Sequence, residues 1–487
     1  MKVNNYDFRK FIDVFIDKNI YWHIELIAMI TGKEKSSAKK GTELNEIKIK
    51  TSLPGPNAKK IVAEDSKYLV TTTKSLPVVG YRARGLFVED VDGNVFLDFS
   101  SGISVTNVGH VHPYVTQKVK EQLDRMWHFA GTDYYYKEQV EAAKAIESIV
   151  PGKFQKKVFF SNSGTESNEA AIKIAKAHTR RQQFIGFIGG FHGRSNGSLS
   201  FTASKASHRA GFFPSMPGVV HVPFPNPYRN PFGIDGYEHP DELVELTLEY
   251  IEKYVFRTFL PPEDVAAFMV EPVQGEGGYI VPPKTFHKKL RKLADDNDIL
   301  VIMDEVQTGF GRTGKFFGSE HFGVEPEIMS LAKAIASGIP MGAVAINARL
   351  DFDHPGMHSN TFGGNLIASA ASIATIEVMK KEKLVENSAK MGLYLKKRLL
   401  ELQEKYDEIG DVRGLGLMTA IDFVRDRKTR EPAAKLRDEV ERKSYENGLL
   451  LLSTGLSAIR IIPALIVNEH QIDMGIDALD KAINQSL

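Results

Sequence analysis

Two residues that follow apolar runs have the side chains needed for chemistry at a carbonyl group. Asp304 comes directly after the run Ile-Leu-Val-Ile-Met at 299–303, and Lys333 lies in Ser-Leu-Ala-Lys-Ala at 330–334. A carboxylate at a strand end can hold a heterocyclic nitrogen protonated, and a lysine can form an imine with an aldehyde. The pair therefore indicates a bound aldehyde on an electron-accepting heterocycle. By itself the pair is not specific, because many strands end in Asp and most lysines are solvated.

Short apolar runs alternate with helix-like segments from about residue 120 onward. The runs lie at 158–160, 184–188, 266–270, 299–303 and 342–346, and most are followed by Gly, Ser, Asp or Glu. This alternation predicts an α/β fold with a mostly parallel sheet covered by helices on both faces. Ligands of such sheets bind at the carboxyl ends of the strands, where Asp304 is expected.

Both chain ends differ from this pattern and predict a smaller α+β domain. Residues 84–99 are typical of a hairpin that turns at Asp92-Gly93-Asn94, and residues 386–487 alternate long amphipathic helices with short strands. The predicted parts are an extension and linker at 1–50, the small domain at 51–115 and 373–487, and a large cofactor-binding domain at 116–372.

The composition excludes several classes of protein. The chain has 487 residues, of which 42% are hydrophobic and 25% charged, and its formal net charge is +1. Such a charge predicts no nucleic-acid partner and no membrane partner. The absence of cysteine excludes disulfides, thiolate metal sites and a cysteine nucleophile, and is compatible with the cytoplasm, the location we predict.

The first fifty residues need a separate interpretation. Residues 20–31 are apolar, but they contain His23 and Glu25 and are shorter than the ~20 residues of a membrane span. We expect an amphipathic helix or a poorly ordered extension here, followed by a polar linker at 33–48. A natural start at Met29 is an open alternative.

The segment 161–168 has the features of a phosphate site. Ser163 and Glu166 have the spacing of a capping box, which predicts that a helix begins here. The amides of Gly164 and Thr165 would then lie free at the positive end of the helix dipole. An ordinary capped helix with no ligand remains the alternative.

Two other loops carry groups suited to a flat ring and to acid chemistry. Phe191-His192-Gly193-Arg194 follows the run 184–188, so that Phe191 could stack on a ring while His192 is equally typical of a structural histidine. The loop at 271–278 contains two carboxylates, one of them Glu276, and three glycines; a turn with surface acids is the alternative.

Two patterns are misleading. Residues 309–314 match G-x-G-x-x-G, but no good helix opening follows, and the two acids that end the preceding strand would repel a pyrophosphate. His110 and His112 lack the partners of a metal site, so we expect a structural loop and no metal.

From about residue 75 to the C-terminus, the chain resembles the class III pyridoxal-phosphate aminotransferases. The matching segments, in order, are 101–103, 107–110, 163–168, 191–194, 271–278, 304–314, 332–334 and 360–365. The resemblance implies pyridoxal 5′-phosphate as cofactor and small-molecule amino acids and 2-oxo acids as substrates. The cofactor-binding residues that it implies are Ser163, Gly164, Thr165, Phe191, His192, Asp304, Gln307, Lys333 and Thr361.

Within that set, the resemblance assigns several roles. Lys333 attaches to the cofactor aldehyde, Asp304 pairs with the pyridine nitrogen, and Gln307 bonds the ring hydroxyl. Thr361 corresponds to a threonine that reaches the phosphate of the neighbouring subunit, which implies a homodimer with shared active sites. Higher assembly remains open.

The resemblance also indicates a substrate. Arg460 is similar to the family's α-carboxylate arginine, and Glu276, a catalytic candidate with Lys333 and Asp304, is similar to its neutralising partner. Arg194 and Ile103 resemble the 4-aminobutyrate branch, in which an arginine at this place binds the distal carboxylate. We therefore expect transfer of the amino group of 4-aminobutyrate to 2-oxoglutarate.

Two enzymatic alternatives stay open, an amino-acid racemase of the same family and an ornithine or acetylornithine aminotransferase. Archaeal racemases are similar at 200–205 and 225–231, although they tend to have Asp where this chain has Glu276. The ornithine branch has a tyrosine where this chain has Ile103. A protein that only binds its ligand is disfavoured because it would not need Lys333.

Overall fold

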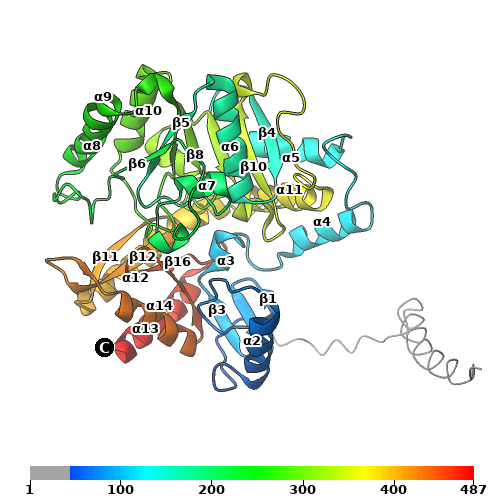
Figure 1. The fold of residues 1–487 in the computed structure, drawn as a ribbon. Coiled ribbons are helices and arrows are strands. Elements are labelled where there is room, and N and C mark those ends of the chain that lie inside the picture. Colours follow the sequence, from blue (N-terminus) through cyan, green and yellow to red (C-terminus); the bar gives the residue numbers. More distant parts are fainter. Residues whose placement is uncertain (1–43) are drawn as a thin grey trace, which may run out of the picture. The chain divides into compact units, whose positions relative to one another are not determined.

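Seven apolar strands form the central sheet of the protein (Figure 1). The structure is a computed structural model, and it describes residues 44–487. In spatial order, the strands are β4 (Lys156–Ser161), β10 (Gly342–Asn347), β9 (Ile328–Leu331), β8 (Leu300–Asp304), β7 (Val265–Val270), β5 (Gln183–Phe187) and β6 (Val219–Val222).

The sheet is mostly parallel, which confirms the predicted fold class. Neighbours from β9 to β6 all pair in parallel, whereas β10 is antiparallel to both β4 and β9. The apolar runs did not reveal this reversal. It arises because β9 and β10 are joined without the long crossover that a parallel pair requires.

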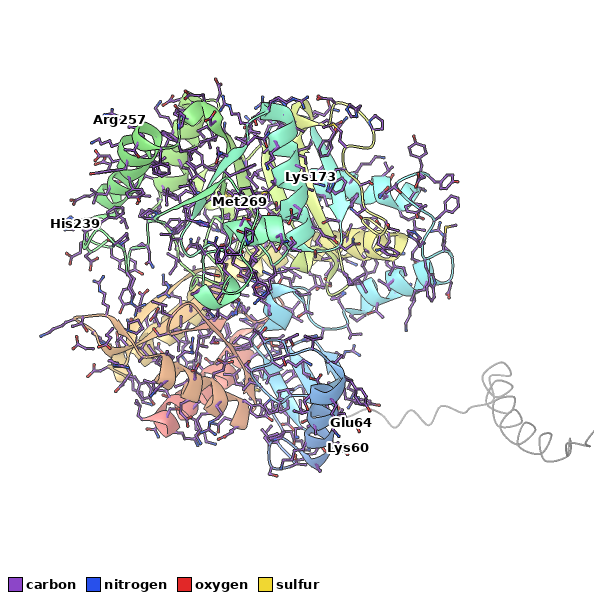
Figure 2. The ribbon with its side chains drawn as sticks, in the orientation of Figure 1. Lys60, Glu64, Lys173, His239, Arg257 and Met269 are labelled. Atoms are coloured by element: carbon purple, nitrogen blue, oxygen red, sulfur yellow. The ribbon has the colours of Figure 1, made fainter. Side chains whose placement is uncertain are left out.

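Helices cover both faces of the sheet because successive strand residues point to opposite faces. Phe268 of β7 belongs to the cluster formed with α8 (Pro240–Glu249) and α10 (Phe286–Asp296). Its neighbour Met269, labelled near the middle of Figure 2, belongs to the cluster formed with α6 (Gly164–Thr179). Burial on both faces explains why the strand reads as one continuous apolar run.

Two smaller sheets are built from the two ends of the described chain (Figure 1). One joins β1 (Gly80–Arg84), β2 (Phe87–Asp90) and β3 (Val95–Asp98) to β14 (Leu449–Leu450). The other contains β11 (Ile409–Leu415), β12 (Met418–Asp426), β16 (Ala458–Ile461) and β15 (Leu452–Thr454), with β13 (Glu431–Pro432) paired to β12. The β2–β3 hairpin confirms the turn predicted at residues 92–94.

The remaining helices link and cover these sheets. They are α2 (Pro56–Tyr68), α3 (Ser101–Ser104), α4 (Pro113–Leu123), α5 (Lys137–Glu147), α7 (Asn196–Phe201), α9 (Phe256–Thr258), α11 (Leu366–Lys381), α12 (Leu384–Lys405), α13 (Ala434–Glu446) and α14 (Glu469–Ser486). Among the described residues, no helix has the length and apolar character that crossing a bilayer would take.

Two groups of expectations remain predictions. The domain boundaries at residues 50, 115 and 372 are not decided by the sheet topology, although β14 pairs in parallel with β3 from the other end of the chain. The segment 20–31 and residues 33–43 of the expected linker lie outside the described residues.

Candidate active site at the carboxyl ends of the central strands

A cavity of about 910 Å³ lies beside the carboxyl ends of the parallel strands. Its walls come from the loops that follow β4, β5, β7, β8 and β9, together with α3, β15 and β16. All the predicted site residues except Thr361 line it, namely Ile103, Ser163, Gly164, Thr165, Phe191, His192, Arg194, Glu276, Asp304, Gln307, Lys333 and Arg460. Residues far apart in the sequence meet here because parallel strands end at one edge of the sheet.

Asp304, the last residue of β8, is a buried carboxylate with three hydrogen-bond partners. Its Oδ2 lies 2.7 Å from His192 Nδ1 and accepts a 2.8 Å hydrogen bond from Asn168 Nδ2, while its Oδ1 accepts one of 3.0 Å from the amide of Val306. Burial opposes the protonation of His192, but the hydrogen bond and the charge of Asp304 outweigh it and raise the pKa of His192. The arrangement stabilises a negative charge at the floor of the cavity.

Lys333 follows β9 at the start of a short 3₁₀ helix, η5 (Lys333–Ala336). Its φ of 50° places a non-glycine residue in the left-handed region, which is the kind of backbone strain that collects at functional sites. Burial lowers the pKa of Lys333, and the positive charge of Arg460 adds to this, whereas Asp304 opposes it. A lowered pKa leaves more of the amine unprotonated and nucleophilic.

The amino end of α6 lines the same cavity with Ser163, Gly164 and Thr165. Ser163 caps the helix by accepting a hydrogen bond from the amide of Glu166, which confirms the predicted start. A capping box would also have the Glu166 side chain accept a hydrogen bond from the amide of Ser163. This second bond is not formed, because Glu166 Oε2 accepts from the amide of Asn162 at 2.6 Å instead. A Cβ on Gly164 would lie 2.8 Å from a methyl of Val306, so only glycine allows this close approach.

Several polar atoms in the cavity wall fit a ring with polar substituents. Gln307 Nε2 and His192 Nε2 are buried and have no hydrogen-bond partner within residues 44–487. Buried polar groups in native proteins are normally paired, so these atoms suit a bound polar ligand. Phe191 adds an aromatic ring to the same wall, and its amide donates a 2.9 Å hydrogen bond to Glu271 Oε1.

A second set of charges lies farther along the cavity. Arg460 in β16 donates from Nη2 to Glu276 Oε1 at 2.6 Å and to the carbonyl of Ser453 at 2.9 Å. Its Nε and Nη1 are buried and take no partner from residues 44–487. Arg194 is exposed at the cavity wall, with its guanidinium 5.8 Å from the centre of the Phe191 ring. Two arginines therefore face one space that could hold two carboxylates.

Ile103 enters the cavity from a strained turn. Its φ is 66°, an unusual value for a β-branched residue, and its neighbours Ser101 and Ser104 also have positive φ. The side chain is exposed although it is apolar. Such strain is typical of a residue whose position matters for a ligand.

The sequence interpretation missed three residues of this site. Asn168 holds Asp304, Glu271 accepts from the amides of Phe191 and Gly275 and so joins two loops, and Lys205 lines the cavity near Glu276. Burial raises the pKa of Glu271 to about 7. The position of Glu271 directly after a strand was a usable signal. Asn168 lies one helical turn beyond Gly164, and Lys205 ends the segment 200–205 that resembles archaeal racemases, but neither residue was assigned to the site from the sequence.

The two misleading patterns have structural explanations. Residues 309–314 form turns and a bend. Arg312 is buried and donates hydrogen bonds to the carbonyls of Leu417 and Pro463 and to Asn107 Oδ1. His110 Nε2 lies 2.8 Å from Asp98 Oδ2, and His112 Nε2 lies 3.1 Å from Glu382 Oε1. Both patterns thus serve packing between segments of the chain.

A lysine with a lowered pKa, a buried carboxylate and the amino end of a helix line one cavity, and this combination suits an enzyme that works through a bound aldehyde cofactor. Comparison with known proteins gives the family. The sequence model described as "Aminotransferase class-III" matches residues 68–483. An alanine/serine racemase from Pyrococcus horikoshii is 38% identical, with 90% of this chain and 93% of the relative covered. A probable 4-aminobutyrate aminotransferase from Bacillus subtilis is 35% identical, with 86% and 95% covered.

Among solved structures, a PLP-bound amine transaminase from an uncultivated Pseudomonas species superposes with a TM-score of 0.80. It is 30% identical, and 86% of this chain and 98% of that chain are covered. The protein belongs to the class III aminotransferase family, has the fold of the pyridoxal-phosphate transaminases, and uses pyridoxal 5′-phosphate. The resemblance inferred from the motifs is thereby confirmed.

The contacts of Asn168 lead to a prediction for cofactor binding. Asn168→Ala removes a donor from the buried Asp304 carboxylate and should raise the dissociation constant of pyridoxal phosphate by about ten- to a hundredfold, since one lost charge-assisted hydrogen bond is worth roughly 1.5–3 kcal/mol. Titration of apoenzyme, followed by fluorescence, measures this constant. Asn297→Ala, which removes a hydrogen bond outside the cavity, is the control. An unchanged constant for Asn168→Ala contradicts its positioning of Asp304.

Proposed function

We propose that the protein transfers the amino group of an ω-amino acid, best represented by 4-aminobutyrate, to 2-oxoglutarate, giving succinic semialdehyde and glutamate. The observation that carries this proposal is the 2.6 Å pair between Glu276 and Arg460 in a cavity that Arg194 also lines. A donor whose reacting carbon has no carboxylate needs Arg460 neutralised, whereas a 2-oxo acid needs it free. A carboxylate partner that can leave the arginine meets both needs.

The cofactor contacts that we propose follow from the walls of the cavity. Ser163, Gly164 and Thr165 would hold the phosphate at the amino end of α6. Phe191 would stack on the ring, with His192 supporting Asp304 beneath it. The unpaired Gln307 Nε2 supports a bond from that amide to the ring hydroxyl.

The reaction depends on three further side chains. Bound pyridoxal phosphate supplies an aldehyde carbon that takes and returns the amino group and a ring that accepts electron density. Asp304 would keep the ring nitrogen protonated, which favours removal of a proton from the substrate. Lys333 Nζ would take that proton from the reacting carbon of the substrate and deliver it to the cofactor carbon. Arg194 and Ile103 would orient the distal carboxylate and the chain of the substrate.

A racemase is the second candidate, and the 38% identity to an alanine/serine racemase favours it. A racemase must move protons on both faces of the substrate carbon. Lys333 could serve one face, and Glu276 lies in the same cavity. The engagement of Glu276 with Arg460 favours transamination, because a carboxylate that neutralises the arginine is not placed as a free base.

We also propose that the active unit is a homodimer. Thr361 is exposed and does not line the cavity of its own chain, as expected if it serves a neighbour. The next residue, Phe362, is exposed, and its ring lies 5.1 Å from the ring of His128. Trp127 is 64% exposed and Tyr135 is 97% exposed, and such apolar surface is typical of an interface.

The visible spectrum of the holoenzyme distinguishes transaminase from racemase. We expect 4-aminobutyrate alone to abolish the absorbance of the cofactor's aldehyde form, and 2-oxoglutarate to restore it with formation of glutamate. A band that persists, with an L-amino acid losing optical activity in the absence of any 2-oxo acid, would instead establish racemisation.

Arg194→Gln should raise the KM for both 4-aminobutyrate and 2-oxoglutarate by about ten- to a hundredfold. The reason is that the distal carboxylate of each substrate loses its ion pair with the guanidinium, which is worth about 1.5–3 kcal/mol. With pyruvate, which has no distal carboxylate, the KM should stay the same. Steady-state kinetics measures both values. The control is Arg257→Gln on α9, an exposed arginine that Figure 2 shows at the edge of the central-sheet region. Equal KM values in Arg194→Gln and wild type would remove the assigned role.

The dimer is tested by a double substitution, Trp127→Glu with Phe362→Glu. Charges in an apolar interface should shift the protein to monomers in sedimentation velocity and weaken cofactor binding through the loss of Thr361 from the neighbour. Tyr254→Glu, at an exposed aromatic of the π-helix η2 (Tyr250–Val255), is the matched control. A wild-type protein that sediments as a monomer at micromolar concentration would refute the proposed dimer.

A further inference from the structure

Glu276 lies between two cations, and only one of them belongs to the arginine pair described above. Its Oε1 accepts the hydrogen bond from Arg460, while its Oε2 lies 3.7 Å from Lys205 Nζ. Lys205 comes from the segment just before the 3₁₀ turn η1 (Ala206–His208) and lines the cavity. At 3.7 Å the two groups attract each other without forming a hydrogen bond.

The electrostatics of the three groups are linked. Burial acts to raise the pKa of Glu276, but Arg460 and Lys205 outweigh it and hold that pKa below its usual value. Burial lowers the pKa of Lys205, and the positive charge of Arg460 adds to this, whereas Glu276 opposes it. An anion that neutralised Arg460 would therefore remove a repulsion from Lys205 and strengthen its attraction for Glu276.

The 2-oxo acid half-reaction creates a problem that these charges can resolve. When an α-carboxylate takes Arg460, Glu276 loses its main partner although its side chain is only 20% exposed. A buried carboxylate left without a cation costs several kcal/mol. Lys205 is 31% exposed and has a flexible stem, so its ammonium can follow a carboxylate over the short distance needed.

We propose that Lys205 is a second ion-pair partner for Glu276. The carboxylate of Glu276 moves from Arg460 to Lys205 when the α-carboxylate of a substrate binds to Arg460. Lys205 is thus a positioning residue that sets the affinity for 2-oxo acids by stabilising the open form of Arg460. This inference deepens the proposed transamination and rests on it. A direct contact between Lys205 and the distal carboxylate of the substrate would be a different role, because it would affect the affinity for dicarboxylates only.

The test compares Lys205→Met with Lys205→Arg in both half-reactions of the holoenzyme. Lys205→Met should raise the KM for pyruvate and for 2-oxoglutarate about tenfold, with the KM for 4-aminobutyrate changed less than about threefold. Lys205→Arg, which keeps the positive charge, should have KM values much closer to those of wild type. Lys173→Met, an exposed lysine of α6 labelled in Figure 2, is the control for folding and cofactor content. A loss for 2-oxoglutarate but not for pyruvate overturns the proposal in favour of direct distal binding.

A double-mutant cycle tests whether Lys205 acts through Glu276. In a Glu276→Gln background, Lys205 has no carboxylate at residue 276 to pair with. Adding Lys205→Met should therefore change the KM for pyruvate by less than about twofold. Losses that multiply in the double variant overturn the proposal.

One readout is independent of turnover. Titration of the holoenzyme with lactate, an unreactive analogue of pyruvate, should give a dissociation constant about tenfold higher for Lys205→Met, followed through the cofactor absorbance. Failure of wild type to accept an amino group from 4-aminobutyrate would sink the proposed function alone. Equal lactate affinity in wild type and Lys205→Met would sink the role of Lys205 alone.

Discussion

A buried negative charge at the end of β8 is the constraint on which the site depends. Asp304 is only 3% exposed, and a carboxylate in such a place is tolerated only when donors surround it. Those donors come from three separate segments: Asn168 on α6, His192 after β5 and the amide of Val306. Holding one charge therefore brings together the loops that carry the proposed phosphate site, the aromatic wall and Gln307. Glu271 makes a similar link between the loops after β5 and β7.

The loop that carries Glu276 connects this rigid floor to the second small sheet. The carbonyl of Glu276 accepts from the amide of Gly455, and the carbonyl of Gly278 accepts from Arg413 Nε at 2.8 Å. Arg413 is in turn paired with Asp411 and Asp422. Since the backbone of the loop is held on both sides, the proposed movement of Glu276 would involve its side chain alone. The proposed rotation between two cations would let one site bind both kinds of substrate.

Much of the fold was readable because the signals were local. The apolar runs that became β4, β5, β7, β8 and β10, the hairpin and the cap of α6 each depend on side chains within a few residues of one another. The antiparallel direction of β10 could not be predicted from the sequence, since the direction of a strand depends on how the chain returns to the sheet. The second half of the capping box failed for a related reason, because the loop geometry offered Glu166 the amide of Asn162 instead.

The sequence by itself determined the family, the cofactor and the identity of the residues that could do the chemistry, because motif residues and their order along the chain carry that information. Only the tertiary structure decided how those residues meet. Asn168 and Lys205 become part of the site through packing of α6 against β8 and through the approach of residue 205 to the loop at 276. No spacing in the chain encodes a 3.7 Å approach between side chains 71 positions apart, because such contacts arise from the arrangement of whole elements.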